Sequence, residues 1–475
     1  MIKHEYPFKW VILKSHLLDE EKRINAFSYS LESLQVLQIL EKLKKENINI
    51  ATFHEFCDKI FYPSRFKRTY AKDGSLFLSS KDILNFVLTG KKVKNLDKDY
   101  LVQKNWILVT RSGSVGRVVL TNKNFDNVGV SEHVIRVIPR QNIPVGYLYA
   151  YLSSNLGQSL LVRKIFGGVV KEIEPFHISN IPIPLLRESD IKEIDKKIIE
   201  AHKLREEAQE ALVKAVKLFY KELDLPILKE ESINYLGNEG EKLAKSFIIK
   251  SEQLFVKNFR LNASSYLPMC LYAESFLKRG EQKGKFKLKK LKDVSDKIFT
   301  PPRFKRIYVK DQSEGVPLLQ GSHIPMIKYF DLKYVSKKMR NLDEYIIREN
   351  WILVTCSGTV GRVFLTTKLC DGWAATNHMT RIIPSDEINA GYLTCFLQSF
   401  YGLSQLQALM YGGVVEEIGE AGELLGEILV PIPLQHIQEK IGKLVIEAYE
   451  KKDQANTLED EAIQLLEKKI EGEAK

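Results

Sequence analysis

The sequence predicts an α+β protein of two similar modules, each of which ends in a long amphipathic helix. Three observations support this fold class. Most of the sequence occurs twice, each copy contains short β-branched runs separated by glycine turns, and each copy closes with apolar residues spaced by threes and fours. The two apolar helix faces are of equal length, so they most simply pack on each other.

The composition allows several globular domains and favours an acidic partner. The chain has 475 residues and a mass of 54.7 kDa, which suggests two to four domains at roughly 100–200 residues each. Its 71 Lys and Arg residues exceed its 60 Asp and Glu residues, giving a formal net charge of +11 and a pI of about 9.0. Such an excess favours nucleic acid as a partner, although a basic protein without such a partner fits the charge equally well.

The cysteines and the apolar runs indicate the compartment. The five cysteines are odd in number, and none lies in a C-x-x-C pair. This argues against a disulfide framework and a structural zinc site, and it predicts buried or incidental thiols in a reducing, cytoplasmic environment. The N-terminus has only a short apolar run and soon becomes acidic, unlike a signal peptide. No apolar run reaches ~18 residues, so no membrane-spanning helix is expected.

The internal repeat is clearest in one segment. Residues 106–120 read WILVTRSGSVGRVVL and residues 351–365 read WILVTCSGTVGRVFL, so twelve of fifteen positions agree at an offset of 351 − 106 = 245. A period this long indicates duplicated domains rather than a solenoid. The same offset pairs FGGVVKEI at 166–173 with YGGVVEEI at 411–418, His133 with His378, Arg136 with Arg381 and Pro139 with Pro384.

The flanking matches extend the repeat to about 23–224 and 260–471. They are DKIFYPSRFKRTY at 58–70 with DKIFTPPRFKRIY at 296–308, R-I-N-A at 23–26 with R-L-N-A at 260–263, and IPIP at 181–184 with VPIP at 430–433. The second copy also carries an insertion, IGEAGELLGE, before its VPIP segment. Between the matches, the copies share little at 74–104 and 315–349. Modules with one architecture and different ligands would show this pattern, and so would drift in surface loops.

Within each copy, the residue pattern predicts a mainly antiparallel sheet and helices. Trp106–Thr110 and Arg117–Thr121 indicate two strands around a tight glycine turn, and His133–Pro139 indicates a third. Gly146–Leu161 has helical spacing. Ile181–Pro184 contains two prolines that cannot continue a helix, so an extended strap is expected.

A heptad seam follows each strap. Each helix should span about 30–35 residues, or roughly 45–50 Å. Parallel and antiparallel pairing are both compatible with the link from 225 to 260. The seam contains Ile191, Ile194, Ile198, Ala201, Ala208, Leu212, Ala215 and Phe219 in the first helix, with a slip at 204/205, and Ile437, Ile441, Leu444, Ala448, Ala455, Leu458, Ala462 and Leu465 in the second, with Lys451 at one seam position.

Known active-site motifs are missing from the sequence. It contains no phosphate-binding P-loop, no dinucleotide fingerprint, no H-E-x-x-H and no G-x-S-x-G. The Asn/Asp-Pro-Pro-aromatic signature of adenine methyltransferases is also missing, so the chain is not expected to methylate by itself. His133 and His378 lack an adjacent carboxylate or cysteine at an obvious spacing, which favours a structural or phosphate-contacting role.

Three groups of polar residues are candidates for DNA contacts. The hairpin loops combine hydroxyls and arginines with glycines that let the backbone approach a phosphate, and the segments after Pro63 and Pro302 interleave basic residues with a phenylalanine. Ordinary surface turns and solvated edge strands would show similar residues. The candidates are Arg111, Ser112, Ser114 and Arg117 with Ser357, Thr359 and Arg362 in the hairpins, Arg65, Lys67 and Arg68 with Arg303, Lys305 and Arg306 after the prolines, and Gln320, Ser322 and His323 in a further loop.

The order of these motifs, and its repetition, resembles the specificity subunit of Type I restriction–modification systems. The resemblance rests on the twin modules, WILVTRSGSVGRV, the G-Y-L-x-x-[YF]-L helix, GGVVKEI, the IPIP strap, the heptad helix and the R-[IL]-N-A-x-x-Y blocks, and it covers nearly the whole chain. It implies two target-recognition domains, at 1–187 and, with the linker, at 226–434. It also implies spacer helices at 188–225 and 435–475, packed as an antiparallel coiled coil with pseudo-two-fold symmetry.

The resemblance further implies a chain that is not an enzyme by itself. Each domain would read one half of a split, asymmetric double-stranded DNA target. Two methyltransferase subunits would dock on the spacer, with Ile191, Ile194, Ile198, Leu212, Phe219, Ile437, Ile441, Leu444, Leu458 and Leu465 in the helices, and restriction–translocase subunits would join them. S-adenosylmethionine, ATP and magnesium would belong to those partners, and this chain would bind no cofactor or metal.

One substitution and two alternative functions leave this interpretation open. Arg111 is replaced by Cys356 in the second copy, which puts a base contact there in doubt because a thiol bonds weakly. A twin-domain scaffold that binds proteins through its helices, with incidental basic patches, is an alternative function. An enzyme with an unrecognised site is another.

Overall fold

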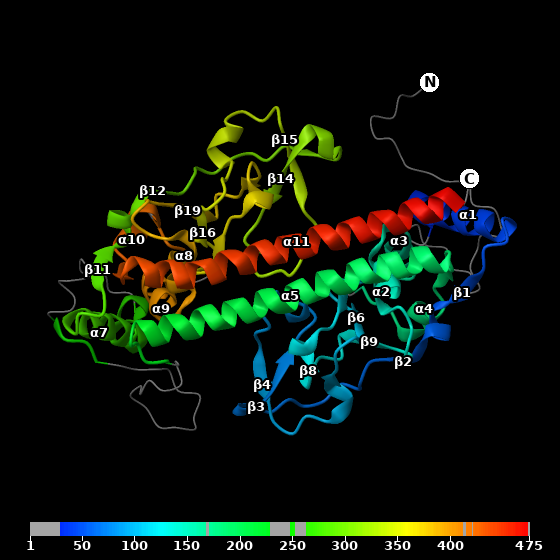
Figure 1. Cartoon of the computed structure of the whole chain (residues 1–475), viewed down its shortest axis with the longest axis horizontal. Helices are drawn as coiled ribbons and strands as arrows, with labels where there is room; N and C mark the ends of the chain where they lie inside the picture. Colours follow the sequence, from blue (N-terminus) through cyan, green and yellow to red (C-terminus); the bar gives the residue numbers. More distant parts are fainter. Residues whose placement is uncertain are drawn as a thin grey trace. The chain divides into compact units, whose positions relative to one another are not determined.

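The computed structural model describes residues 29–167, 171–228, 248–251, 263–411, 415–419 and 421–473 (Figure 1). The chain divides into two compact units. Unit 1 combines the residues up to Glu206 with those from Gln454 onward, and unit 2 comprises Glu207–Asp453. The block at 23–26, most of its mate at 260–263, much of the 225–260 link and parts of both GGVV segments lie outside the described residues.

Unit 1 contains module one, the first copy of the repeat. Its strands form an antiparallel sheet in the order β2-β9-β6-β7, a second sheet in the order β4-β3-β8-β5 with β3 and β8 parallel, and the antiparallel pair β1-β10. The elements are α1 (Leu31–Lys45), β1 (Ile50–Thr52), β2 (Cys57–Phe61), β3 (Tyr70–Leu78), β4 (Lys91–Val93), β5 (Leu101–Val102), β6 (Ile107–Thr110), β7 (Val118–Leu120), β8 (Val128–Val130), β9 (Val134–Pro139), α2 (Val145–Ser153), α3 (Asn155–Arg163), α4 (Pro175–Ser179) and β10 (Pro182–Pro184).

Unit 2 contains module two and repeats most of this plan, with a different edge strand in its second sheet. Its sheets have the orders β12-β19-β16-β17, β13-β15-β14-β18 with β14 and β18 parallel, and β11-β20. The α+β class with mainly antiparallel pairing is therefore confirmed in both units. The elements are α7 (Pro268–Gln282), β11 (Lys287–Lys290), β12 (Ser295–Phe299), β13 (Tyr308–Val309), β14 (Gly315–Leu319), β15 (Lys333–Ser336), β16 (Ile352–Thr355), β17 (Val363–Leu365), β18 (Ala374–Ala375), β19 (Met379–Pro384), α8 (Ala390–Gln398), α9 (Phe400–Ala408), α10 (Ala421–Gly426) and β20 (Leu429–Ile432).

The predicted hairpin is present in both modules, as β6–β7 and β16–β17. Its loop holds Gly113 and Gly116 at φ of 82° and 85°, and their mates Gly358 and Gly361 at 81° and 87°. Residues with a Cβ atom rarely adopt this left-handed region, so the turn requires glycine there. Thr110 also fixes the loop, because its hydroxyl donates to the carbonyl of Ser114 and accepts from the N–H of Arg117.

The single helix predicted at Gly146–Leu161 is wrong, because the chain forms two helices, α2 and α3. The break lies at Ser154, whose backbone is extended and whose hydroxyl accepts from the N–H of Gly157 at 3.1 Å. This is an N-cap, which starts a new helix with a changed direction. Ser399 plays the same part between α8 and α9, with Gly402 as its partner.

The strap is extended, as predicted, and it pairs as strand β10 or β20. The tyrosine of the G-Y-L motif holds it in both modules, because the hydroxyls of Tyr147 and Tyr392 donate to the carbonyls of Pro184 and Pro431 at 2.6 Å. The insertion of module two contributes to α10, whose Ala421 and Leu425 are buried in the core.

The long helices are α5 (Glu188–Glu222) and α11 (Gln435–Glu473), and the predicted antiparallel coiled coil is confirmed in each unit. In unit 1, the start of α5 lies beside the end of α11 (Figure 1), where Asp190 pairs with Lys469 at 2.9 Å and Lys197 with Glu461 at 2.8 Å. In unit 2, Lys451 pairs with Glu207 at 2.7 Å and Lys440 with Glu222 at 3.2 Å. Residue numbers rise along one helix as they fall along the other.

The predicted seam needs correction in its charged positions. The first helix does not slip at 204/205, because Arg205 itself occupies the seam and only 2% of its side chain is exposed. In the second helix, Ile441, Ala448, Ala455 and Ala462 are buried as predicted. At the other positions the buried residues are Val445, Lys452, Glu459 and Leu466, whereas the predicted Leu444, Lys451, Leu458 and Leu465 are half-buried. Arg205 forms an ion pair with Glu459 at 2.6 Å and donates a hydrogen bond to Asn456 at 2.8 Å. A seam placed from apolar residues alone is shifted by one position here, because charged residues occupy part of the real seam.

His202, next to this pair, gives a testable pH dependence. Its ring is buried edge-on to Tyr149 at a centroid distance of 5.6 Å. Burial, together with Arg205 and Lys104 and against Glu459, lowers the pKa of His202 to about 3. The unfolded chain takes up this proton below pH ~6.5 and the folded chain does not, so stability falls as the pH drops from about 6.5 toward 3. We expect a loss of about 2 kcal/mol between pH 7 and pH 5 from this group.

The measurement compares urea unfolding of the wild type and His202→Leu at pH 7 and pH 5. The variant should lose less stability on acidification than the wild type, because its apolar side chain cannot bind the proton. Equal losses in the two proteins would show that His202 does not titrate in this way.

Candidate nucleic-acid interface

In each module, a connector joins the two four-stranded sheets and carries the sequence R-F-K-R. It runs from β2 to β3 in module one and from β12 to β13 in module two. The phenylalanine anchors it, since Phe66 packs on Tyr100 at a centroid distance of 4.3 Å and Phe304 packs on Tyr345 at 3.8 Å. The first and third residues therefore point outward: Arg65, Lys67, Arg303 and Lys305 are all exposed, and 88% of the Arg65 side chain is accessible.

The last residue of each connector points inward and makes a structural contact. The Arg68 guanidinium donates to the Glu132 carboxylate at 2.6 Å, and only 6% of the Glu132 side chain is exposed. Burial alone would raise the pKa of Glu132, but its own backbone N–H and Arg68 lower it. In module two, Asn377 replaces this acid and accepts from Arg306 at 3.4 Å. Arg68 thus reaches DNA only if it leaves this pair.

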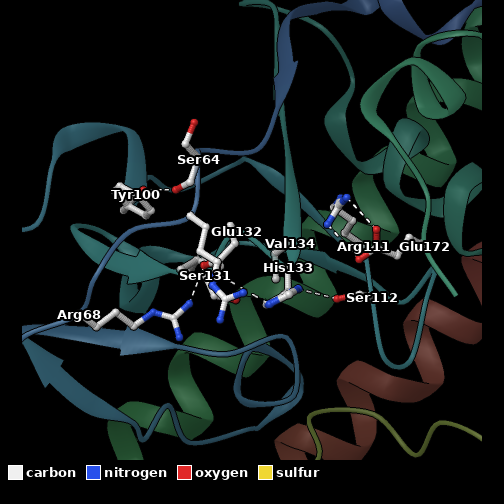
Figure 2. A network of polar contacts seen from close by, with 12 residues as sticks. Ser64, Arg68, Tyr100, Arg111, Ser112, Ser131, Glu132, His133, Val134 and Glu172 are labelled. Carbon is white, nitrogen blue, oxygen red and sulfur yellow. Dashed lines mark hydrogen bonds and ion pairs between the residues drawn. The ribbon is translucent and has the colours of Figure 1, made fainter. Parts of the chain in front are cut away.

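The hairpin loop of module one is closed by an ion-pair cluster (Figure 2). Arg111 donates to both oxygens of Glu172, at 3.1 and 2.8 Å, and to Glu174 at 2.8 Å, and its guanidinium lies 4.4 Å from the centroid of the Tyr62 ring. Ser112 Oγ lies 2.7 Å from Nδ1 of His133. The Nε2 atom of the same ring lies 3.7 Å from Glu132, so the expectation that His133 has no carboxylate partner is wrong. The side chain of Arg111 is therefore occupied within the module, and a base contact by it stays an untested prediction.

The hairpin loop of module two has different partners. Cys356 stands in place of Arg111 and is buried, and Ser357 donates to Glu417 at 2.9 Å. Arg362 is half-buried and donates to the carbonyl of Gly321 at 3.0 Å, and burial lowers its pKa. Ser114 in module one and Thr359 in module two are exposed at the loop tips, while Arg117 is half-buried.

The further loop of module two does not present all of its predicted residues. Gln320 is half-buried and Ser322 is exposed. His323, however, is only 3% exposed, and its Nδ1 accepts from the N–H of Gln320 at 3.1 Å. Burial lowers its pKa. The prediction that His323 reads base edges is therefore not retained, because its ring fixes the loop from inside.

The five thiols are free and buried, as predicted. Burial raises the pKa values of Cys57, Cys370 and Cys395 to about 12, which keeps them protonated. Within the part of the chain that the structure describes, no cluster of His, Cys, Asp and Glu could hold a metal ion. No helix among the described residues is long and apolar enough to cross a membrane.

Comparison with protein-family models gives two matches, one per module. The model is the Type I restriction modification DNA specificity domain, and it matches residues 35–217 and 283–465. The chain belongs to this family. Its two specificity domains thus include the hairpin, the connector, the strap and most of the helix that follows in each copy.

The comparison with solved structures lists two specificity subunits. The Type-I restriction-modification system S subunit from M. genitalium is 15% identical, with 89% of this chain and 96% of that chain covered and a TM-score of 0.35. The HsdS subunit from Thermoanaerobacter tengcongensis is 12% identical, with 90% and 97% covered and a TM-score of 0.28. A structure described for complex assembly and conformational transition of the type I R-M system is also 12% identical, with 89% and 97% covered and a TM-score of 0.28. The comparison with curated proteins found no match.

Each specificity domain also contains a repeated arginine that is not a DNA candidate. Arg136 and Arg381 are fully buried, and each guanidinium donates to four backbone carbonyls. For Arg136 these belong to Tyr100, Val130, Ser131 and Val134. For Arg381 they belong to Tyr345, Ala375, Thr376 and Met379. Burial lowers the pKa of both to about 10, so both stay charged at neutral pH. The two arginines therefore recur in both modules because they stabilise the fold, and not because they contact DNA.

Sequence reasoning missed the carboxylates of the site. Glu132, Glu172 and Glu174 set the positions of Arg68 and Arg111 in module one, and Glu417 occupies the matching place in module two. One signal was available, because the glutamate of the repeated K/E-E-I segment recurs at the offset of 245.

Proposed function

We propose that this chain is the DNA-reading subunit of a Type I restriction–modification complex and that each module reads one half of a bipartite target. The repeated connector carries the proposal. Two exposed basic residues flank a partly buried phenylalanine that packs on a tyrosine ring in each module, so an anchored connector presents cations for a phosphate backbone beside the hairpin loop. Phosphate contacts of this kind fix the register of a protein on DNA and leave base readout to the neighbouring loops.

The two half-targets should differ in sequence. The frame of the modules is the same, but the residues at the hairpin site are not: Arg111, Glu132 and Glu174 in module one correspond to Cys356, Asn377 and Gly419 in module two. Side chains with different charge and hydrogen-bonding capacity select different base edges. An asymmetric target therefore follows from the same proposal.

The paired helices would set the gap between the two half-targets. Helix α5 has 35 residues and α11 has 39, so each is roughly 50–60 Å long. This length corresponds to about one and a half turns of B-DNA at ~34 Å per turn. The antiparallel ion pairs in each unit support a spacer of fixed register.

Methyl transfer and cleavage would belong to partner subunits. In this proposal, two methyltransferase subunits bind the helices and restriction–translocase subunits join them, and S-adenosylmethionine, ATP and magnesium bind to those partners. The chain would then act by positioning these enzymes on the DNA, without a reaction of its own.

A binding assay with random duplexes over a salt series tests this function. The chain, alone and with its methyltransferase partner, should bind duplex DNA with an affinity that falls steeply between 50 and 200 mM salt, because bound phosphates release counterions. Binding that is absent, or unaffected by salt, in both preparations would favour the protein-binding scaffold. In the host genome, the methylated motif should be split and asymmetric with a fixed gap.

A further inference from the structure

Module two has a pocket at its hairpin site. Its volume is about 260 Å³. Its lining combines apolar residues such as Pro301 and Ile418 with polar side chains from the connector, the hairpin loop, the segment before β19 and the segment after α9. The polar side chains include Arg303, Ser357, His378, Tyr411 and Glu417. All of these elements belong to unit 2.

Module one shows what fills the corresponding space. There, the Arg111 guanidinium pairs with Glu172 (Figure 2) and also contacts the Tyr62 ring and the carboxylate of Glu174. In module two, three of these four residues are replaced by smaller ones: Tyr62 corresponds to Thr300, Arg111 to Cys356 and Glu174 to Gly419, while Glu172 corresponds to Glu417. The pocket is thus the site of a guanidinium that module two does not supply.

Glu417 is the acceptor left in this pocket. Its carboxylate accepts from Ser357 at 2.9 Å. No Lys or Arg among the described residues forms an ion pair with it, whereas Glu172 accepts two hydrogen bonds from Arg111. A half-buried carboxylate with remaining lone pairs selects a group with N–H donors, and the smaller residues that replace Tyr62, Arg111 and Glu174 leave space for such a group beside it.

The charges around the pocket favour a hydrogen-bond donor that is part of a polyanion such as DNA. Arg303 lies at the pocket itself, and Lys305 is exposed on the same connector. A cationic ligand would be repelled by these charges, but a DNA strand whose phosphates lie on the connector brings neutral base edges to the pocket. His378 adds no competing charge, because burial, Arg306 and Arg303 lower its pKa and keep its ring neutral at physiological pH.

We infer that this pocket reads an exocyclic amino group of a nucleobase, so that Glu417 restricts one position of the second half-target to adenine or cytosine on the contacted strand. This inference rests on the proposed function. Adenine and cytosine each present an amino donor in the major groove, where guanine and thymine present a carbonyl oxygen. A carboxylate accepts from the amino group and repels the carbonyl oxygen, since it has no donor of its own. In module one, Arg111 already satisfies the carboxylates, so the first half-target should lack this restriction at the equivalent position.

Selection from a randomised duplex library tests the inference with Glu417→Gln in the full-length chain. A glutamine amide has the same shape but also offers N–H donors, so guanine and thymine become acceptable at the restricted position. The preference for adenine or cytosine over guanine or thymine should fall about tenfold or more at that position alone. Glu416→Gln is the matched control. Glu416 precedes Glu417, but its side chain is exposed and lies outside the pocket. The change removes the same charge, and this variant should keep the wild-type motif.

A second measurement gives its main result on the wild-type protein, so that result does not depend on how the variant folds. Wild-type protein is bound to duplexes in which the selected adenine is replaced by purine, or the selected cytosine by 2-pyrimidinone, both of which lack the amino group. The affinity should fall about tenfold for the wild type and less for Glu417→Gln. An unchanged motif in Glu417→Gln, or analogues that bind the wild type as tightly as the natural bases, would overturn the inference. If the wild type enriches no sequence at all, the proposed function fails instead.

Discussion

Replacement of Arg205 by leucine is expected to destabilise unit 1 by about 3–5 kcal/mol, because it takes the guanidinium away from the buried carboxylate of Glu459. The two side chains are 2% and 1% exposed and their charged atoms are 2.6 Å apart. For a unit of this size the loss corresponds to a decrease of roughly 10 °C in the melting temperature. Circular dichroism and hydrogen exchange along α5 and α11 would measure it.

Two further variants separate the buried charge from the lost contact. The double variant Arg205→Leu with Glu459→Leu should recover most of the stability, because an apolar pair in a seam needs no charge compensation. Lys197→Ala removes a more exposed ion pair of the same helices and should cost no more than about 1 kcal/mol. If Lys197→Ala were as harmful as Arg205→Leu, burial of the charge would not be the cause.

Neutralising the connectors should have the largest effect on DNA binding. In the variant with Arg65→Gln, Lys67→Gln, Arg303→Gln and Lys305→Gln, four exposed cations are lost while both phenylalanine anchors remain. Each phosphate contact contributes about 0.9 to the slope of log K against log salt. The slope for random duplexes should therefore fall by about 3 to 4 for the full variant, and by about half as much when only one connector is changed.

A matched variant controls for net charge. Lys42, Lys44, Lys278 and Arg279 are also exposed and lie on α1 and α7, and glutamine at these positions removes the same total charge. This protein should keep a salt slope close to that of the wild type. An equal decrease in both variants would mean that the overall charge, and not the connector, binds the phosphates.

The fold was predictable where local pattern determines it. The duplicated hairpin depends on a β-branched run and two glycines, the strap on two prolines, and the long helices on apolar spacing, so each could be inferred from a short window of residues. The break at Ser154 was missed because a serine cap within an apolar stretch leaves the helical period on both sides intact. The seam was misplaced at Arg205 because its partner Glu459 is far away in the sequence.

The candidate site was predictable only as a set of residue types. The sequence places Arg65, Arg68 and Arg111 in similar basic, turn-rich surroundings, yet only Arg65 extends into solvent. Arg68 and Arg111 are held by hydrogen bonds to Glu132 and Glu172, which lie more than 60 positions along the chain. Arg65 lies 4.0 Å from Glu132, and 88% of its side chain stays exposed. Charge and spacing in one segment cannot show whether an arginine is already neutralised.

The buried guanidiniums of Arg136 and Arg381 have a consequence for how specificity could change over time. Each binds backbone carbonyls, and three of the four residues that supply them differ between the modules, as Val130, Ser131 and Val134 against Ala375, Thr376 and Met379. Because these hydrogen bonds go to main-chain carbonyls, they do not depend on which side chains the partner residues carry. The loop before β9 or β19, which holds Glu132 in one module and Asn377 in the other, can therefore accept new recognition residues without loss of the fold. Exchange of these loops between the two modules should give folded proteins with altered targets.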